Sequence, residues 1–492
     1  MTSQTLIEAR KAEEIFEKQI DSGDRPAFHL STRAGWMNDH NGFYFYKGEY
    51  HLFYQYYPYA PKWGPMHWGH AVSSDLLRWK YLPAALAPDK SYDKDGCFSG
   101  SAVVLPDGRH LLMYTGVSME GDGWDKAAQT QCLAVGDGLE YEKYEGNPVL
   151  TDKDLPQGAF KQDFRDPRMI EMADGTYLCV VGSRPADGSG QILLYESRDG
   201  FHWNFKSVLC ENRGRFGMMW ECPDMFELDG KWMLLTSPQD MLPEGFEYHN
   251  GNGTLCLMGS FDQQSGKFTE ETDQAIDYGI DFYATQTILA EDGRRIMIGW
   301  MQNWDTCDLH MEKRVWCGQM SLPRELSIRN GRLYQAPIRE LAEHRRNGAF
   351  FEGAVEGIVK PEGFNGRLSE IDIEIDASDE DFSYQKFSVR FAQDERFHTQ
   401  VSYRPQEGTL KIDRKFSGSR RAVIHQRRTK VKPVDGKLKL KIIQDRFSVE
   451  VFVNDGEKVM TAVLYTDTTA DGVTFVSEGK TKVRAVKWDL VF

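Results

Sequence analysis

The chain has 492 residues, and its 74 acidic side chains outnumber its 59 basic ones, which gives a net charge of −15. One hydrophobic core usually stops growing at about 250 to 300 residues, so the length predicts two domains. The negative charge repels phosphate backbones and anionic bilayers, which argues against nucleic acid and membrane as partners. No stretch is apolar and long enough to cross a bilayer, so we expect a soluble protein.

Residues 1–28 are predicted to form an N-terminal helical segment. Apolar side chains stand among many charges, as on an amphipathic helix and unlike the apolar core of a signal peptide: Leu6, Ile7, Ile15, Phe16 and Ile20. We therefore expect a cytoplasmic protein. The eight cysteines form no CxxC pair and lack zinc-finger spacing, so the sequence predicts neither a metal site nor a cofactor.

An internal repeat runs through residues 29–335. Asp75, Asp137, Asp199 and Asp262 follow one another at intervals of 62, 62 and 63 residues. Within each interval, about four short runs rich in Val, Ile, Tyr, Phe and Trp alternate with Asp-Gly turns, a pattern typical of strands. Radial stacking of such units, with a fifth at 285–335, predicts a five-bladed β-propeller. A large β-sandwich is the alternative, although a sandwich requires no such period.

The repeat ends before residues 336–350, which have apolar side chains at helical spacing and are predicted to form a linker helix. Residues 351–492 alternate between apolar and polar side chains, as at Ile371, Ile373 and Ile375, which indicates antiparallel sheets with one exposed face. The predicted fold class is therefore all-β, with a five-bladed β-propeller followed by a C-terminal β-sandwich. The sandwich strands leave open whether that domain forms a homo-oligomer interface or an accessory sugar module.

Three acidic residues stand at equivalent places in the repeat. Asp39, Asp166 and Glu221 precede the turn aspartates of their units by 36, 33 and 41 residues. Equivalent strands of a propeller converge around its axis, so we expect these carboxylates to line one funnel. Glycosidic bond cleavage requires one carboxylate as nucleophile or base and another as proton donor. Each acid alone also fits a structural role, such as an Asx-turn, but the three together favour catalysis.

The surroundings of each acid predict its role. Asp39 is crowded by Asn and Gly, whose amide donors are expected to keep a nucleophile ionised. Glu221 has an apolar setting, which is expected to raise its pKa and make it the general acid. Asp166 has Arg165 beside it, so we expect a lowered pKa and a role in binding sugar hydroxyls. Most aromatic residues are expected to pack inside blades, whereas Trp63 lies in a loop, where ligand contacts are common.

These motifs resemble those of glycoside hydrolase family 32, the β-fructofuranosidases that include invertases and sucrose-6-phosphate hydrolases. The resemblance extends over nearly the whole chain. The matching segments are Trp36 to Gly42, Trp63 to His70, Phe98 to Ser101, Arg165 to Pro167, Glu221 to Pro223, Asp277 to Ala284 and Ser321 to Glu325. His40 is a departure, because the family usually has Pro there.

The resemblance implies that Asp39 is the nucleophile, Glu221 the acid/base and Asp166 the transition-state stabiliser of a retaining double displacement. It also implies contacts with the fructosyl unit from Asn38, Gln55, Trp63, Phe98, Ser99, Arg165, Tyr283 and Trp300. The implied substrates are sucrose, sucrose 6-phosphate or short fructo-oligosaccharides. Two alternatives are a non-catalytic sugar-binding propeller, which predicts loss of one carboxylate, and an arabinan- or xylan-degrading propeller enzyme.

Overall fold

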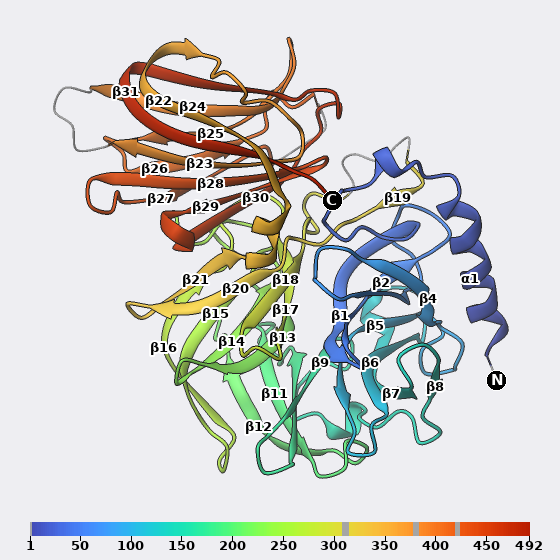
Figure 1. Ribbon diagram of the computed structural model, residues 1–492. Coiled ribbons are helices and arrows are strands. Elements are labelled where there is room, and N and C mark those ends of the chain that lie inside the picture. Colours follow the sequence, from blue (N-terminus) through green and yellow to red (C-terminus); the bar gives the residue numbers. More distant parts are fainter. Residues whose placement is uncertain (1, 308–313, 377–382, 419–423) are drawn as a thin grey trace.

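The computed structural model describes residues 2–307, 314–376, 383–418 and 424–492. The chain forms a five-bladed β-propeller and a C-terminal β-sandwich, which lie one above the other in Figure 1. The predicted all-β fold class is confirmed, and a single large β-sandwich is excluded. Among the described residues, no helix has the length and apolar composition that crossing a bilayer requires.

Each propeller blade is a four-stranded antiparallel sheet whose strands follow one another in chain order. The strands are β1 (Gly35–Tyr46), β2 (Glu49–Tyr57), β3 (His67–Ser73) and β4 (Lys80–Leu86); β5 (Gly96–Val104), β6 (His110–Met119), β7 (Ala127–Gly136) and β8 (Tyr141–Lys143); β9 (Phe164–Glu171), β10 (Tyr177–Ser183), β11 (Gln191–Ser197) and β12 (Asn204–Glu211); β13 (Trp220–Leu228), β14 (Lys231–Pro238), β15 (Leu255–Asp262) and β16 (Lys267–Ala275); and β17 (Tyr283–Leu289), β18 (Arg295–Trp300), β20 (Arg324–Arg329) and β21 (Arg332–Pro337). Two 3-10 turns, η2 (Trp124–Lys126) and η3 (Asp152–Asp154), lie in the connections.

The 62-residue period marks the turn between the third and fourth strands of a blade. Asp75 Oδ1 accepts hydrogen bonds from the backbone amides two and three residues later, at 3.0 and 2.7 Å. Asp199 Oδ1 does the same at 2.8 and 2.9 Å. Because the carboxylate replaces a backbone acceptor, the same short residue fixes the same turn in successive blades.

The first strands of the blades, β1, β5, β9, β13 and β17, form the inner ring of the propeller. Each contacts the first strands of both neighbouring blades. The ring is closed by β19 (Trp316–Cys317), which leaves the fifth blade and pairs in parallel with β1, where Gly35 faces Trp316. The inner strands are buried along most of their length, so polar side chains placed on them must find partners inside the ring.

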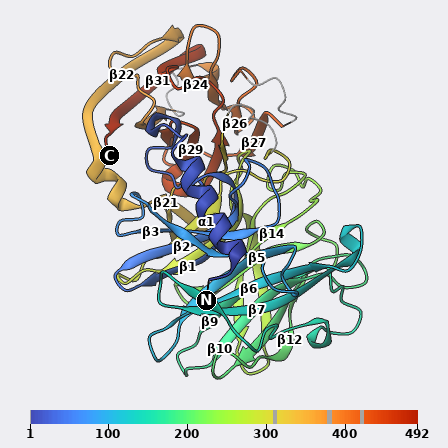
Figure 2. The same cartoon turned by 90° about the vertical axis from the view of Figure 1, so that its right-hand side faces the viewer.

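The predicted N-terminal helix is α1 (Gln4–Glu17), followed by η1 (Ser22–Asp24). The Ser3 hydroxyl caps α1 by accepting the Leu6 amide at 3.2 Å. Figure 2 shows α1 lying along the outer side of the first blade. Glu13 anchors it there, since its buried carboxylate accepts from the Arg33 guanidinium at 2.8 Å and from the Ala84 amide at 3.1 Å.

The connection between the domains contains less helix than expected, since a linker helix was predicted over the whole of residues 336–350. A single 3-10 helix, η4 (Arg339–His344), is followed at once by β22 (Arg345–Val359). Residues 345–350 are already in a strand because their backbone pairs with β31, for example Phe350 with Val486.

The C-terminal sandwich is a continuous network of ten strands folded into two layers. Besides β22, its elements are β23 (Ser369–Asp376), β24 (Tyr384–Gln393), β25 (Thr399–Arg404), β26 (Thr409–Asp413), β27 (Gln426–Lys430), β28 (Lys437–Asp445), β29 (Ser448–Val453), η5 (Asn454–Gly456), β30 (Lys458–Val463) and β31 (Gly472–Leu490). The long strand β31 joins the layers, since its first part pairs with β24 and its second part with β23. The alternating apolar residues of β23 are buried between the layers.

A buried ionic network joins the two domains. His29 Nδ1 lies 2.8 Å from Asp445 Oδ2, and His29 Nε2 lies 3.1 Å from Glu450 Oε1. Arg324 of β20 donates to Glu450 Oε2 at 3.0 Å and to Asp277 Oδ2 at 3.1 Å. Burial alone would lower the pKa of His29, but the hydrogen bonds that its ring donates to Asp445 and Glu450, and the charges of those carboxylates, outweigh burial and raise that pKa to about 9.

Candidate active site

Every inner strand of the propeller carries a β-bulge near its start, and the predicted acids lie in or beside these bulges. The register shifts fall between Met37 and His40, Phe98 and Gly100, Arg165 and Arg168, Glu221 and Asp224, and Tyr283 and Gln286. Asp166, Cys222 and Ala284 adopt positive φ angles of 64, 50 and 54° there. A bulge breaks the strict alternation of a strand and re-aims its side chains, which turns neighbouring residues toward the axis.

The bulges bring Asp39, Asp166 and Glu221 together. The Cys222 thiol lies between two of them, with Sγ 3.5 Å from Asp39 Oδ2 and 3.7 Å from Asp166 Oδ2. The next residue back, Glu221, has its carboxylate held by Arg165, whose Nε donates to Oε1 at 3.0 Å. All three acids are buried, so the chain gathers three carboxylates that were more than fifty residues apart in sequence.

Asp39 is buried and has few hydrogen-bond donors. Ser99 Oγ donates to Asp39 Oδ2 at 3.3 Å, while Oδ1 has no hydrogen-bond partner among the described residues. Burial, and then the charge of Glu221, raise the pKa of Asp39 to about 6, and the donors Asn38 and Cys222 lower it by less. The expectation that amide donors set the pKa of Asp39 is therefore wrong, because burial raises this pKa by more than the donors lower it.

The pKa of Asp166 is also higher than the sequence predicted. The Cys222 amide donates to Asp166 Oδ2 at 2.9 Å, and the Asp166 amide donates to Thr115 Oγ1 at 3.0 Å. Burial raises the pKa of Asp166 to about 7, since the attraction of Arg165 is opposed by the charges of Glu221 and Asp39. The predicted lowering of the Asp166 pKa is wrong, because the depth at which this carboxyl is buried cannot be seen from its sequence neighbours.

Glu221 has polar partners in place of the predicted apolar setting. Besides Arg165, the Tyr283 hydroxyl donates to Oε2 at 2.7 Å and Gln239 Nε2 donates to the same oxygen at 3.0 Å. Arg165 is itself oriented by Asp163, whose Oδ1 accepts from Nη1 at 2.8 Å. Three side chains therefore fix the direction of this carboxylate, and Asp163 in turn fixes one of them.

Sequence reasoning missed Gln239 and Asp163 at this site. Gln239 directly follows β14, whose Ser237 pairs with Glu221, so the signal was the end of the neighbouring strand. Asp163 directly precedes β9, two residues before Arg165. Both positions depend on strand ends, which a sequence pattern places only within a few residues.

The predicted substrate contacts divide into a pocket wall and a buried layer. Trp63 and Phe98 line an open pocket of about 440 Å³ together with Arg165 and Glu221. The buried layer beneath contains Asn38, Gln55, Ser99, Tyr283 and Trp300.

Hydrogen bonds and ring contacts order that buried layer. Asn38 Oδ1 accepts from Trp36 Nε1 at 2.8 Å, and Gln55 Nε2 donates to the Cys97 carbonyl at 3.1 Å. Trp300 is fully buried and packs against Trp36 with a centroid distance of 6.1 Å. Trp300 thus supports the site from behind rather than forming its wall.

The unusual His40 also has a structural role. Its Nε2 accepts the backbone amide of Gln286 at 3.0 Å, which ties the bulge of β1 to the bulge of β17. Burial lowers the pKa of His40 to about 3, so the imidazole is neutral at physiological pH. His40, the residue after Asp39, therefore helps to hold the bulge of β1 in place by accepting this hydrogen bond.

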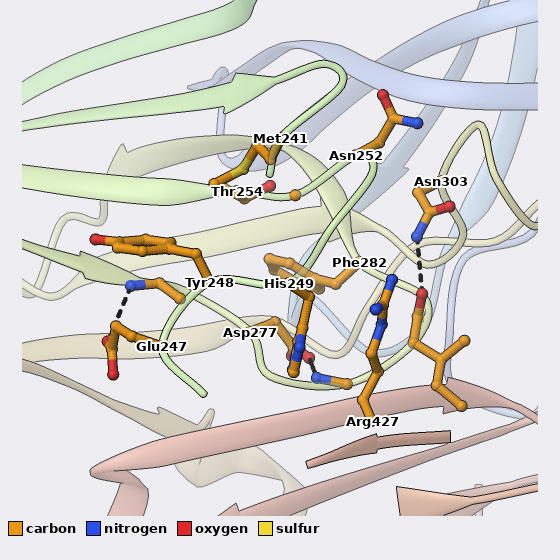
Figure 3. A pocket seen from close by; sticks show the side chains of 14 residues that line it. Met241, Glu247, Tyr248, His249, Asn252, Thr254, Asp277, Phe282, Asn303 and Arg427 are labelled. Carbon is orange, nitrogen blue, oxygen red and sulfur yellow. Dashed lines mark hydrogen bonds between the residues drawn. The ribbon is translucent and has the colours of Figure 1, made fainter. Parts of the chain in front are cut away.

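A second pocket lies where loops of the fourth blade meet the sandwich, and Figure 3 shows its lining. Its volume is only about 30 Å³, roughly that of one water molecule. Two of its polar side chains are engaged, since Asn303 Nδ2 donates to the Ile280 carbonyl at 2.7 Å and Arg427 donates to Asn250 at 2.9 Å. No predicted acid lines this pocket, so the candidate site is the pocket in front of Glu221.

Comparison with protein families agrees with this geometry. The model of the glycosyl hydrolases family 32 N-terminal domain matches residues 29–337, and that of the family 32 C terminal matches residues 340–489. This chain belongs to glycoside hydrolase family 32. The two matches meet at η4, between the last propeller strand and the first sandwich strand.

Several relatives in this family resemble the whole chain. A sucrose-6-phosphate hydrolase of Zymomonas mobilis is 38% identical over 467 residues, which cover 92% of this chain and 88% of that protein. A raffinose invertase of Escherichia coli is also 38% identical and covers 89% of each chain. A Bombyx mori family 32 β-fructofuranosidase, solved as a mutant in complex with sucrose, has a TM-score of 0.85, 34% identity and coverage of 100% and 99%. The chain is therefore a glycoside hydrolase of the β-fructofuranosidase type.

Proposed function

We propose that the enzyme hydrolyses the terminal β-D-fructofuranosyl bond of small sugars with retention of configuration. The observation that carries this proposal is the arrangement of Asp39 and Glu221. Asp39 is buried behind the lining of the open pocket, whereas Glu221 is part of that lining. A nucleophile beneath the fructosyl ring and a proton donor facing the leaving group are what double displacement requires.

In the first half-reaction, an Asp39 oxygen bonds to the anomeric carbon while the bond from that carbon to the leaving oxygen breaks. The Glu221 proton moves to the leaving oxygen. In the second half, Glu221 takes a proton from water, the water oxygen bonds to the anomeric carbon, and Asp39 is released as a carboxylate. Asp166, held by the Cys222 amide, is proposed to bind ring hydroxyls as positive charge develops.

The proposed substrates are sucrose, sucrose 6-phosphate and short fructo-oligosaccharides. Relatives named sucrose-6-phosphate hydrolase support this range, among them that of Lactobacillus gasseri, whose structure matches with a TM-score of 0.84 at 27% identity over 100% of this chain and 97% of that one. We also propose a cytoplasmic location. Free thiols at Cys97, Cys132, Cys179, Cys210, Cys222 and Cys256 support a reducing compartment.

The test is to measure kcat/KM for sucrose and for sucrose 6-phosphate side by side, with Asp39→Asn as the blank. Loss of a nucleophile is expected to reduce kcat/KM by about 10,000-fold or more. Adding methanol as an acceptor should yield methyl β-D-fructofuranoside, because a covalent fructosyl-enzyme transfers the sugar with retention. Binding of sucrose without hydrolysis of either sugar would favour the non-catalytic alternative.

A further inference from the structure

A row of aromatic rings extends outward from the predicted site. The Trp63 ring meets Phe98 edge-on at a centroid distance of 6.1 Å, and Phe98 lies nearly parallel to Trp124, at 5.9 Å and 16°. Trp124 begins η2 in the connection between β6 and β7, and 42% of it remains exposed. An indole that stacks beside Phe98 and remains partly exposed offers a large, rigid apolar surface to a ligand.

A second apolar group lines the same pocket from another blade. Met218 precedes β13 of the fourth blade, whereas Trp124 belongs to the second, and Met218 is 40% exposed. Its position is fixed, because the Met218 amide donates to the Gln239 carbonyl at 2.7 Å and the Gln239 amide donates to the Met219 carbonyl at 3.0 Å. Gln239 also donates to Glu221, so this wall is connected directly to the proposed proton donor.

The direction of the proposed reaction identifies the occupant of this space. The leaving oxygen must lie beside Glu221 and away from Asp39, so the leaving group occupies the pocket that Glu221 faces. We propose that Trp124 and Met218 bind the leaving sugar, a hexopyranosyl ring, by packing against its C–H face. This assignment rests on the proposed fructosidase activity and adds residues that determine the choice of leaving group.

The two arginines of the pocket are bonded to carboxylates, which favours recognition of the leaving sugar by packing. Arg184, one of its guanidinium groups, donates to Asp163 Oδ2 at 2.8 Å and lies over the Phe160 ring at 5.2 Å. The other, Arg165, is shared between Asp163 and Glu221. Both cations are thus committed to carboxylates within the described lining. Apart from Gln239 and the exposed Asp240, the open surface that faces the leaving group is aromatic and thioether.

The experiment compares sucrose with methyl β-D-fructofuranoside, whose leaving group is methanol. Trp124→Ala is expected to lower the ratio of kcat/KM for sucrose to that for the methyl fructoside by about 10-fold, since stacking is lost only for the ring. Trp124→Phe should restore most of the ratio, and Met218→Ala should lower it less. Phe205→Ala is the matched control, because Phe205 is also an exposed aromatic residue, 43% accessible, on the distant strand β12.

An unchanged ratio in Trp124→Ala would overturn the proposal, whether both substrates stay fast or both become slow. The second case would show that Trp124 acts only by supporting Phe98. Thermal melts of each variant separate a folding defect from a loss of binding. If the wild-type enzyme hydrolyses neither substrate, the proposed function itself fails, which is a different result from an unchanged ratio.

Discussion

Buried carboxylates at the active site couple its chemistry to the stability of the fold. Burial raises the pKa of Asp39 to about 6 and that of Asp166 to about 7. In the unfolded chain both groups return to ordinary values near 3.8, so between these limits the folded state binds more protons than the unfolded state. The free energy of unfolding therefore falls as pH rises from about 4 to about 7. Active sites commonly reduce the stability of the fold in this way, because the chemistry requires ionised groups in a place that excludes water.

Replacing Asp39 with Asn is expected to abolish activity and to stabilise the protein. The amide carries no charge to desolvate, so unfolding at about pH 7.5 should cost about 3 kcal/mol more than in the wild type. The gain should shrink as pH falls and vanish below about pH 3, where Asp39 is protonated in both states. Thermal melts across this range measure it, and Asp21→Asn, at an exposed position with no side-chain cap hydrogen bond, is the control. A gain that does not depend on pH would contradict the argument.

Cys222 is expected to set the acidic limb of the pH profile. Its thiol bonds to Asp39 and lowers the pKa of that carboxyl. Removing the donor in Cys222→Ala should therefore raise the pKa of Asp39 and move the acidic limb of kcat/KM to higher pH. Cys222→Ser supplies a stronger donor and should move the limb back. Profiles with a fructosyl substrate test this, and an alanine variant with an unmoved limb would refute the role.

The blades show how far the sequence predicts the elements. The repeat located the aspartate turns after the third strands and placed the acids on the first strands. The repeat did not predict the bulges. The alternation of apolar and polar residues along a strand has a period of two, and it does not show where a bulge adds an extra residue. One signal was present: Pro follows both Asp166 and Cys222, and Pro within a sheet is confined to edge strands, strand starts and bulges.

The turn aspartates are expected to affect stability and leave the chemistry unchanged. Asp199→Ala removes an acceptor for two backbone amides, so it should destabilise the fold by about 1 kcal/mol. Asp199→Asn keeps an acceptor oxygen and should lose less. Urea denaturation gives both values, and kcat/KM should remain at the wild-type level. A loss of activity in the folded alanine variant would mean that this turn also positions the inner strands.

At the scale of the whole molecule, the domains depend on charges that no pattern marks as buried. His29, Arg324 and Glu450 look like surface residues in the sequence, yet all three are buried between propeller and sandwich. Arg414 of the sandwich similarly meets Asp281 of the propeller with both side chains buried. The contacting partners are more than a hundred residues apart, so only the folded chain reveals that each charge is paired. Unpaired, such buried ions would cost several kcal/mol each.

His29→Gln is expected to weaken the junction in a manner that depends on pH. The folded pKa of about 9 exceeds the ordinary value of 6.5, so the protonated imidazole stabilises the fold fully below about pH 6.5, by about 3 kcal/mol. That contribution is lost as pH rises through about 9. Glutamine keeps hydrogen bonds but cannot be charged, so wild-type and variant melting temperatures should differ most near about pH 6 and converge above about pH 9. A difference that grows with pH would mean that the imidazole is neutral and that packing alone makes His29 important to the junction.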